Sequence, residues 1–248
     1  MPDDLPPIVF NSNIINKSND PNLVIPLKRI KKGSEDKYYK YLGILIDEHL
    51  TFEYHIDHIC NKLSRALYCL NRVKRVLDTK ALISIYYSLF HSHLLYCCNI
   101  ISCVSKTNLK RITILQKKAV RAITNSEYNS HTAHLFLKCK IIPFENLLIM
   151  QRALFMHSIY HNYQHISFNT MFTKNQIRDH DHTLRNLNNF YLPQPHTDAF
   201  KRSPSYLLPK TWNELPDETK CLSNRYTFKI ALKNNIFGQL ETDSQILE

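Results

Sequence analysis

Cysteine and histidine are the side chains of this chain best suited to holding a metal ion, and it has 7 of the first and 13 of the second. Cys97, Cys98 and Cys103 lie close together, but adjacent cysteines cannot readily chelate one ion tetrahedrally, and no Cys-x-x-Cys pair accompanies them. Residues 180–182 read His-Asp-His, a pattern more common in polar loops than in ligand sets. The sequence therefore predicts no metal site.

Paired carboxylates are the other candidates for chemistry, because phosphoryl transfer on magnesium ions needs them. Asp3 and Asp4 are adjacent, but they follow Met1 and Pro2 with no preceding strand to position them. No Ser-His-Asp order and no phosphate-binding glycine loop rises above chance either. We therefore expect no catalytic residue in this chain.

The charge of the chain favours a polyanionic partner. A formal net charge of +11 and an isoelectric point near 9.3 attract nucleic acid over long distances. A chain rich in Lys, Asn and Ile with only 3 glycines is also what an AT-rich gene tends to encode. The position of the basic residues is therefore more informative than their number.

Two predicted amphipathic helices carry these basic residues in stripes. Residues 53–77 place apolar side chains on one face and basic ones on the opposite face, namely Lys62, Arg65 and Arg72. Residues 108–124 repeat this plan with Lys110, Lys117, Lys118 and Arg121. No acidic residue interrupts either stripe. The stripes predict contact with backbone phosphates, although charge on a helix face commonly serves solvation alone.

The segment from Ala81 to Ser105 contains no Lys, Arg, Asp or Glu, which would suit a transmembrane helix. Its serines, its histidines and Asn99 would be costly in hydrocarbon, whereas neighbouring helices can satisfy them. We therefore expect no membrane span here. The segment is predicted to be the central helix of a bundle, capped by Asp78 or Thr79, with a core face formed by Leu82, Ile85, Leu89 and Tyr96.

Periodicity predicts three more helices. They cover Phe144 to His161, behind Pro143, then His131 to Lys138, and finally a short stretch from about Tyr226 to Ile236. Prolines interrupt the pattern after residue 163, so loop and extended chain should dominate there, with Trp212 as an anchor beside the last helix.

The octet from Lys40 to Asp47 is predicted to be a strand, since it is rich in β-forming side chains. Within it, Gly43 removes the side chain where another backbone could approach closely. On these residues alone, a buried strand with a glycine bulge is the favoured interpretation of the octet.

Five blocks in order resemble the reverse transcriptases of non-LTR (LINE-type, jockey-like) retrotransposons. The octet and the following His55-Ile56 are similar to the strand that closes the palm and to the start of the thumb. Residues 82–97 and 109–123 resemble the thumb segment and the L-x-x-L-Q-K-K-A-φ-R-x-I helix. Residues 180–185 and 212–216 are similar to the His-x-Thr-Arg and Trp-Asn-x-Leu-Pro blocks. His93, Ile101 and Leu184 depart from the family pattern, which suggests a drifting copy.

The resemblance implies a function in holding nucleic acid. It makes a primer grip of Lys40, Tyr41, Leu42 and Gly43. The intact parent enzyme would synthesise DNA on an RNA template with Mg²⁺ held by aspartates that precede the grip, so this chain is expected to need no cofactor of its own. Its expected partners are RNA or DNA, an RNA/DNA duplex through its phosphates, and the missing fingers and palm. Two alternatives are a stand-alone nucleic-acid-binding helical protein and a relic open reading frame without selected function.

The expected fold is mainly α. It comprises a small β part at the palm edge in residues 1–47, an α-helical thumb-like bundle in 48–162, and an irregular, partly helical, loosely folded segment in 163–248. The start of the chain is not a signal peptide, and its odd number of cysteines favours reduced thiols. We therefore expect an intracellular protein, nuclear or cytoplasmic and not secreted.

Overall fold

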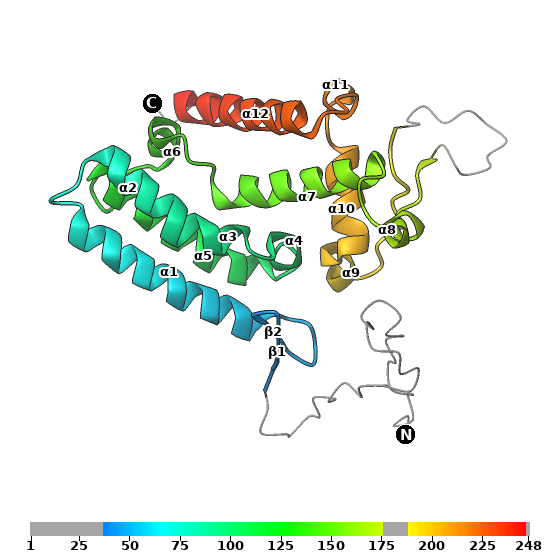
Figure 1. The fold of residues 1–248 in the computed structure, drawn as a ribbon, viewed down its shortest axis with the longest axis horizontal. Helices are drawn as coiled ribbons and strands as arrows, with labels where there is room; N and C mark the ends of the chain where they lie inside the picture. Colours follow the sequence, from blue (N-terminus) through cyan, green and yellow to red (C-terminus); the bar gives the residue numbers. More distant parts are fainter. Residues whose placement is uncertain (1–36, 176–187, 247–248) are drawn as a thin grey trace, which may run out of the picture.

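The computed structural model describes residues 37–175 and 188–246. The described chain is mainly α-helical, with one two-stranded antiparallel sheet at its N-terminal side, which confirms the predicted fold class (Figure 1). The aspartates at residues 3 and 4 and the block at residues 180–185 lie outside the described residues.

The predicted strand over residues 40–47 is in fact a tight hairpin. Strand β1, Tyr39–Tyr41, pairs antiparallel with β2, Ile44–Ile46, and Tyr41 lies opposite Ile44. The two residues between the strands, Leu42 and Gly43, have φ angles of 46° and 83°. Positive φ at both positions is typical of a type I′ turn, which twists with the strands. Gly43 therefore serves the turn and forms no bulge.

The Asp47 carboxylate, just after the hairpin, accepts hydrogen bonds from the backbone that leads into the next helix. Helix α1, Glu53–Val73, has Phe52 at its N-cap with φ 57°, and that residue supplies no capping side chain. Asp47 accepts hydrogen bonds from the backbone N–H of Thr51 at 3.0 Å and of Phe52 at 2.7 Å, and from the Thr51 hydroxyl at 2.5 Å. The helix ends at Val73 and does not continue to residue 77. Its predicted basic stripe is exposed: Lys62, Arg65 and Arg72.

The segment predicted as one central helix is broken into four pieces. They are α2, Thr79–Ile85, a π-helix η1, Tyr86–His91, then α3, Ser92–Leu95, and α4, Cys98–Ile101. Asp78 caps the first piece, as predicted, by accepting from the Ala81 N–H at 3.0 Å. The chain leaves the helix at Tyr96, which is extended, and at Cys97, which has φ 53°. Among the described residues, no helix has the length and apolar character to cross a membrane.

The predicted core face of this segment was wrong beyond its first turn. Leu82 is buried as expected, but Leu89 and Tyr96 are 45% and 48% exposed. The core instead receives Tyr86, Phe90 and Leu94. A π-helical turn contains more residues than an α-helical turn, so it rotates every later side chain away from the 3.6-residue pattern.

The remaining helices of the bundle follow the predicted bounds closely. Helix α5, Lys106–Thr124, packs along α1, and the short α6, Ala133–Cys139, leads to α7, Phe144–Tyr160. Helix α7 is buried on most sides and also packs against α10 and α12, which belong to the C-terminal segment. Helix α6 packs against α12 as well, so α6 and α7 together join the bundle to the C-terminal segment.

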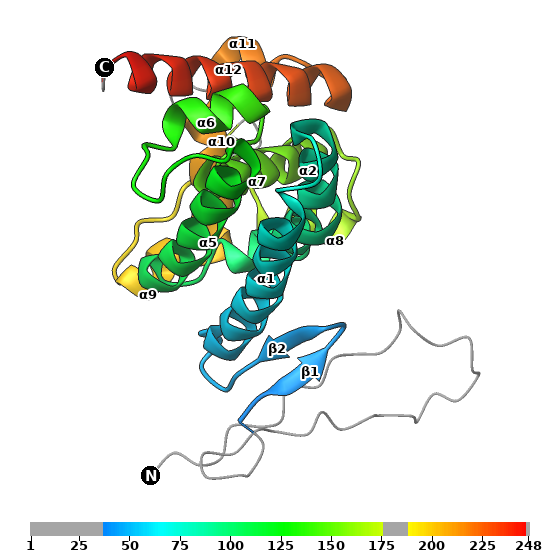
Figure 2. The same ribbon diagram turned by 90° about the vertical axis from the view of Figure 1, so that its left-hand side faces the viewer.

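The C-terminal segment is more helical and better packed than the sequence indicated. Its described residues form five helices: α8, Ile166–Met171, α9, Asp198–Arg202, α10, Pro204–Asn213, α11, Asp217–Lys220, and α12, Arg225–Ile246. Trp212 is fully buried and stacks on Phe228 of α12 at 6.0 Å, which confirms it as the predicted anchor. Figure 2 shows α12 and α6 at one end of the molecule and the hairpin at the opposite end.

Candidate nucleic-acid interface

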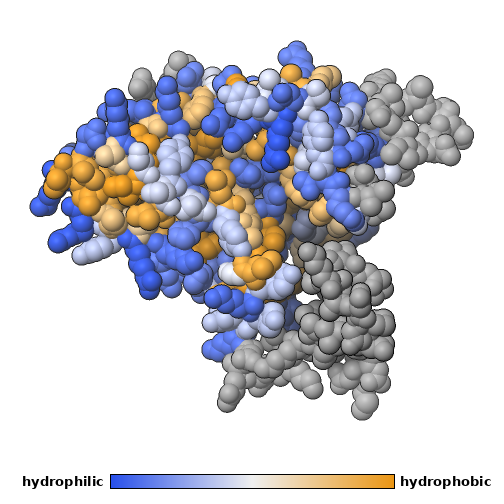
Figure 3. Space-filling model, viewed as in Figure 1, coloured by the Kyte–Doolittle hydropathy of each residue, from blue (hydrophilic) through white to orange (hydrophobic). Residues whose placement is uncertain are grey.

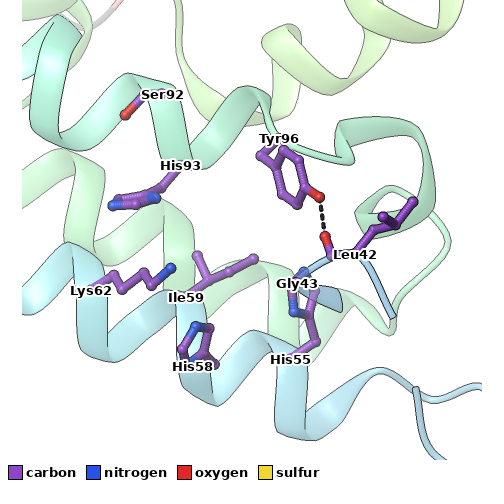
Figure 4. A pocket seen from close by; sticks show the side chains of 9 residues that line it. All are labelled: Leu42, Gly43, His55, His58, Ile59, Lys62, Ser92, His93 and Tyr96. Atoms are coloured by element: carbon purple, nitrogen blue, oxygen red, sulfur yellow. Dashed lines mark hydrogen bonds between the residues drawn. The ribbon is translucent and has the colours of Figure 1, made fainter. Parts of the chain in front are cut away.

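The hairpin turn is fastened to the bundle by one side chain. The hydroxyl of Tyr96 donates a hydrogen bond to the Leu42 carbonyl, and the Tyr96 ring lies beside Gly43 (Figure 4). Tyr96 follows α3, so this contact joins the hairpin to the segment in which the π-helix displaced the core face. The residue expected in the core thus positions the turn at the surface.

His55 at the start of α1 is packed against the hairpin and forms a hydrogen bond with it. It is 2% exposed, and its Nδ1 accepts from the Leu45 N–H at 3.5 Å. Burial lowers the pKa of His55, and the nearby His58 and Lys62 lower it further. His55 is therefore neutral at pH 7 and acts as a packing and hydrogen-bonding group.

A cleft of about 390 Å³ opens between the hairpin turn, α1 and α3 (Figure 4). Its lining combines three histidines and a lysine with small, apolar and hydroxyl-bearing groups: Leu42, Gly43, His55, His58, Ile59, Lys62, Ser92, His93 and Tyr96. None of these lining residues is acidic. The cleft therefore carries no carboxylate, and Lys62 is the lining residue that is charged at neutral pH.

The histidines of the cleft are held neutral by their surroundings. Burial lowers the pKa of His58, and the positive charges of Lys62 and Lys40 add to that effect. Burial and Lys62 lower the pKa of His93 in the same way. A bound anion would offset this repulsion and favour protonation of both rings. The electrostatics of the cleft therefore suit a phosphate better than a cation.

The structure gathers some of the predicted site residues and separates others. The hairpin residues Tyr41 and Leu42 are exposed beside the cleft, and Lys62 lines it. Both Lys40 and Arg65 lie near enough to lower the pKa of His58. Predicted residues from the hairpin and from the first half of α1 therefore meet at one end of the molecule. Arg72 lies nearly two helical turns beyond Arg65 on α1.

The stripe on α5 lies outside this cleft. Lys110 and Lys117 are exposed and Lys118 is half-buried. Arg121 donates from Nε and Nη2 to the Ser130 carbonyl, at 3.0 and 2.9 Å, and so holds the loop after α5. An ion pair of 2.6 Å between Asp57 and Arg111 joins α1 to α5. Changing Arg121 would therefore alter the fold as well as the charge.

Known proteins match part of the chain. One stretch of 108 residues is 29% identical to "RNA-directed DNA polymerase from mobile element jockey" of Drosophila funebris, and covers 42% of this chain. Another of 104 residues is 32% identical to "Probable RNA-directed DNA polymerase from transposon X-element" of Drosophila melanogaster, and covers 40%. This chain is thus similar, over part of its length, to the RNA-directed DNA polymerases of these two mobile elements.

The relationship is partial. Each match spans 12% of the relative's own length. No protein-family profile matches the chain, and no solved structure matches it. The similarity to the polymerases of mobile elements therefore rests on these two partial matches.

The cleft also contains residues that sequence reasoning missed. His58, His93 and Tyr96 complete the cleft, although none was predicted to belong to a site. The repeat of His55 and His58 at the head of α1 was the available signal, since residues three apart lie on neighbouring parts of a helix surface. His93 and Tyr96 gave no such signal, because their orientation depends on the π-helix.

Metal binding finds little support in the described part of the chain. No three of its His, Cys, Asp or Glu side chains gather as a metal site would require. Burial acts to raise the pKa of Asp47, but its hydrogen bonds to Thr51 and Phe52 outweigh that effect and lower it. Asp47 is thus an ionised cap for α1.

Proposed function

We propose that this chain is a part of a retrotransposon reverse transcriptase that holds the template–primer duplex and carries out no chemistry by itself. One observation carries the proposal. The Leu42–Gly43 turn, pinned by Tyr96, stands at the mouth of a cleft that is lined by Lys62 and three histidines and by no carboxylate.

The chemistry of this end of the molecule suits a sugar-phosphate backbone. Tyr39, Tyr41 and Leu42 expose apolar surface on the hairpin, where they are 45%, 52% and 73% accessible. Lys62 supplies positive charge within the cleft, and the neutral histidines beside it can form hydrogen bonds with a phosphate. Phosphate contacts fix the position of a duplex without reading its sequence. We therefore expect binding with little sequence preference.

Fluorescence anisotropy with a labelled RNA/DNA hybrid tests the proposal. The double variant K62Q/R65Q removes two cations at the cleft, and K229Q/K233Q removes two exposed lysines from α12 on the opposite side of the molecule. Each phosphate contact adds about 0.9 to the slope of log affinity against log salt concentration. We expect K62Q/R65Q to reduce that slope by about two units and K229Q/K233Q to leave it unchanged.

Equal losses from the two double variants would contradict the proposal, because they would mean that net charge alone attracts the hybrid. An affinity that neither variant alters would mean that the duplex is held elsewhere. Both variants replace exposed side chains, so circular dichroism should show the same helical content in each.

A further inference from the structure

Three basic side chains from two helices face one another across the cleft. His58 and Lys62 lie one turn apart on α1, and His93 projects towards them from α3 (Figure 4). Both histidines are half-buried, and Lys62 is exposed. None of the three forms a hydrogen bond or an ion pair with another described residue. Their ring and ammonium nitrogens are therefore available to a ligand.

Positive charge surrounds the two histidines. Burial has the largest part in lowering the pKa of His58, and three cations add to it: Lys62, Lys40 and Arg65. Burial and then Lys62 lower the pKa of His93. A proton on either ring is therefore opposed by its neighbours until an anion enters the cleft.

Two neighbouring ionisable groups are held by other contacts. Asp57 pairs at 2.6 Å with Arg111 of α5, whose positive charge offsets that of the carboxylate. His55 is buried, and its Nδ1 accepts from the Leu45 N–H, so a proton on that nitrogen would break the bond to the hairpin. His58 and His93 are therefore the histidines of the cleft that can take up a proton without disturbing the hairpin.

A backbone phosphate is the anion that suits this group. Hydrophilic side chains cover the end of α1 next to the hairpin on the face drawn in Figure 3, so the approach to the cleft is polar. The volume of the cleft, about 390 Å³, lies within the range of small-ligand sites. Phosphate oxygens accept hydrogen bonds from lysine and from both nitrogens of a protonated histidine. A phosphodiester keeps its charge near neutral pH, so a proton taken up on binding must enter the protein, where histidine is the side chain that titrates.

We propose that His58, His93 and Lys62 together bind one phosphate of the nucleic acid, and that the two rings take up protons as it binds. The contact rests on the proposed function, because the same cleft receives the ligand. It makes the affinity for nucleic acid rise as the pH falls, since groups that are more protonated in the complex favour the complex at low pH.

Isothermal titration calorimetry with a 14-base-pair RNA/DNA hybrid counts these protons. Titrations at pH 7 and constant ionic strength, in PIPES and in imidazole buffer, give the proton uptake from the difference in observed enthalpy, because the two buffers release protons with different enthalpies. For the wild-type chain we expect an uptake of about half a proton to two protons. Its affinity should rise at least about tenfold between pH 8 and pH 6, which is the change that an average uptake of about half a proton produces.

The double variant H58Q/H93Q should take up almost no protons and should keep a nearly constant affinity over the same pH range. H131Q/H134Q is the matched control, because it removes two exposed histidines at α6, at the opposite end of the molecule from the hairpin. That control should keep the wild-type uptake, and the single variants H58Q and H93Q should each keep part of it. Circular dichroism should show the same helical content in all of these variants, since the replaced rings are half-buried or exposed.

Three results would overturn the inference. They are hybrid binding by the wild-type chain without proton uptake, an uptake that H58Q/H93Q leaves unchanged, and an uptake that H131Q/H134Q reduces as much as H58Q/H93Q does. The proposed function fails in a different way. A hybrid that the wild-type chain does not bind at either pH, or that K62Q/R65Q does not weaken at pH 8, would refute that function instead.

Discussion

Replacing Gln116 with leucine should destabilise the helical bundle by about 3 kcal/mol. The Gln116 amide is fully buried in α5 and joins three parts of the chain. Its Nε2 donates to the Tyr86 hydroxyl at 2.9 Å and to the Ile142 carbonyl at 3.0 Å, and its Oε1 accepts the Phe144 N–H at 2.7 Å. The last bond caps α7, whose N-cap residue is a proline without a capping side chain.

The magnitude depends on the groups that leucine would leave without a partner. The Tyr86 hydroxyl, the Ile142 carbonyl and the Phe144 N–H would each stay buried, at a cost of about 1 to 3 kcal/mol per group. Leucine would recover about 1 kcal/mol, because it is less costly to bury than an amide. If each of the three groups costs an amount near the lower end of its range, the net loss after the gain from leucine is about 3 kcal/mol.

Urea unfolding followed by circular dichroism measures this loss, and Tyr86→Phe is the matched control. That variant removes one hydrogen bond and leaves the Gln116 amide bonded to Ile142 and Phe144, so it should cost only about 1 kcal/mol. If Gln116→Leu were no more destabilising than Tyr86→Phe, the amide would not be the group that joins α5 to the start of α7.

Three further outcomes are expected. Gly43→Val should cost the turn about 1 to 3 kcal/mol, because valine resists φ 83°, and should weaken hybrid binding several-fold without unfolding the bundle, whereas Gly238→Val in open space on α12 should do neither. The free energy of unfolding should fall as the pH drops below about 6.5, because burial lowers the pKa of His157 and the unfolded chain therefore gains a proton that the folded chain resists. His157→Gln should make the unfolding free energy from urea titrations depend less on pH, and an unchanged dependence would refute the role of His157. Purified chain should give no primer extension with RNA template and magnesium, and robust incorporation of nucleotides would contradict that expectation.

The regular helices could be predicted from the sequence because each buries one apolar face. The stripes of α1 and α5 follow the 3.6-residue period, and α7 is apolar over most of its surface. The C-terminal segment was underestimated because its prolines were read as interruptions. Pro204 instead occupies the first turn of α10, and Pro209 lies inside that helix. The anchoring of Trp212 could still be predicted, since a lone tryptophan beside an apolar helix has much surface to bury.

The candidate site was predicted only in part, for one physical reason. The resemblance predicts residues 40–43 and helical periodicity predicts Lys62 and Arg65, and of these Leu42, Gly43 and Lys62 line the cleft. The other wall of the cleft comes from the segment that contains η1, where a widened turn shifts the buried face. Periodicity assumes a regular helix, so it placed Tyr96 in the core and gave His93 no role.

Lysine acetylation footprinting of the wild-type chain tests most directly whether the cleft and hairpin hold a duplex. Mass spectrometry would compare the acetylation of each lysine with and without a bound RNA/DNA hybrid. We expect the hybrid to protect Lys40 and Lys62, which lie at the hairpin and the cleft, and to leave Lys229 and Lys233 on α12 fully reactive. Unchanged acetylation of Lys40 and Lys62 at a hybrid concentration that saturates the chain would contradict the account.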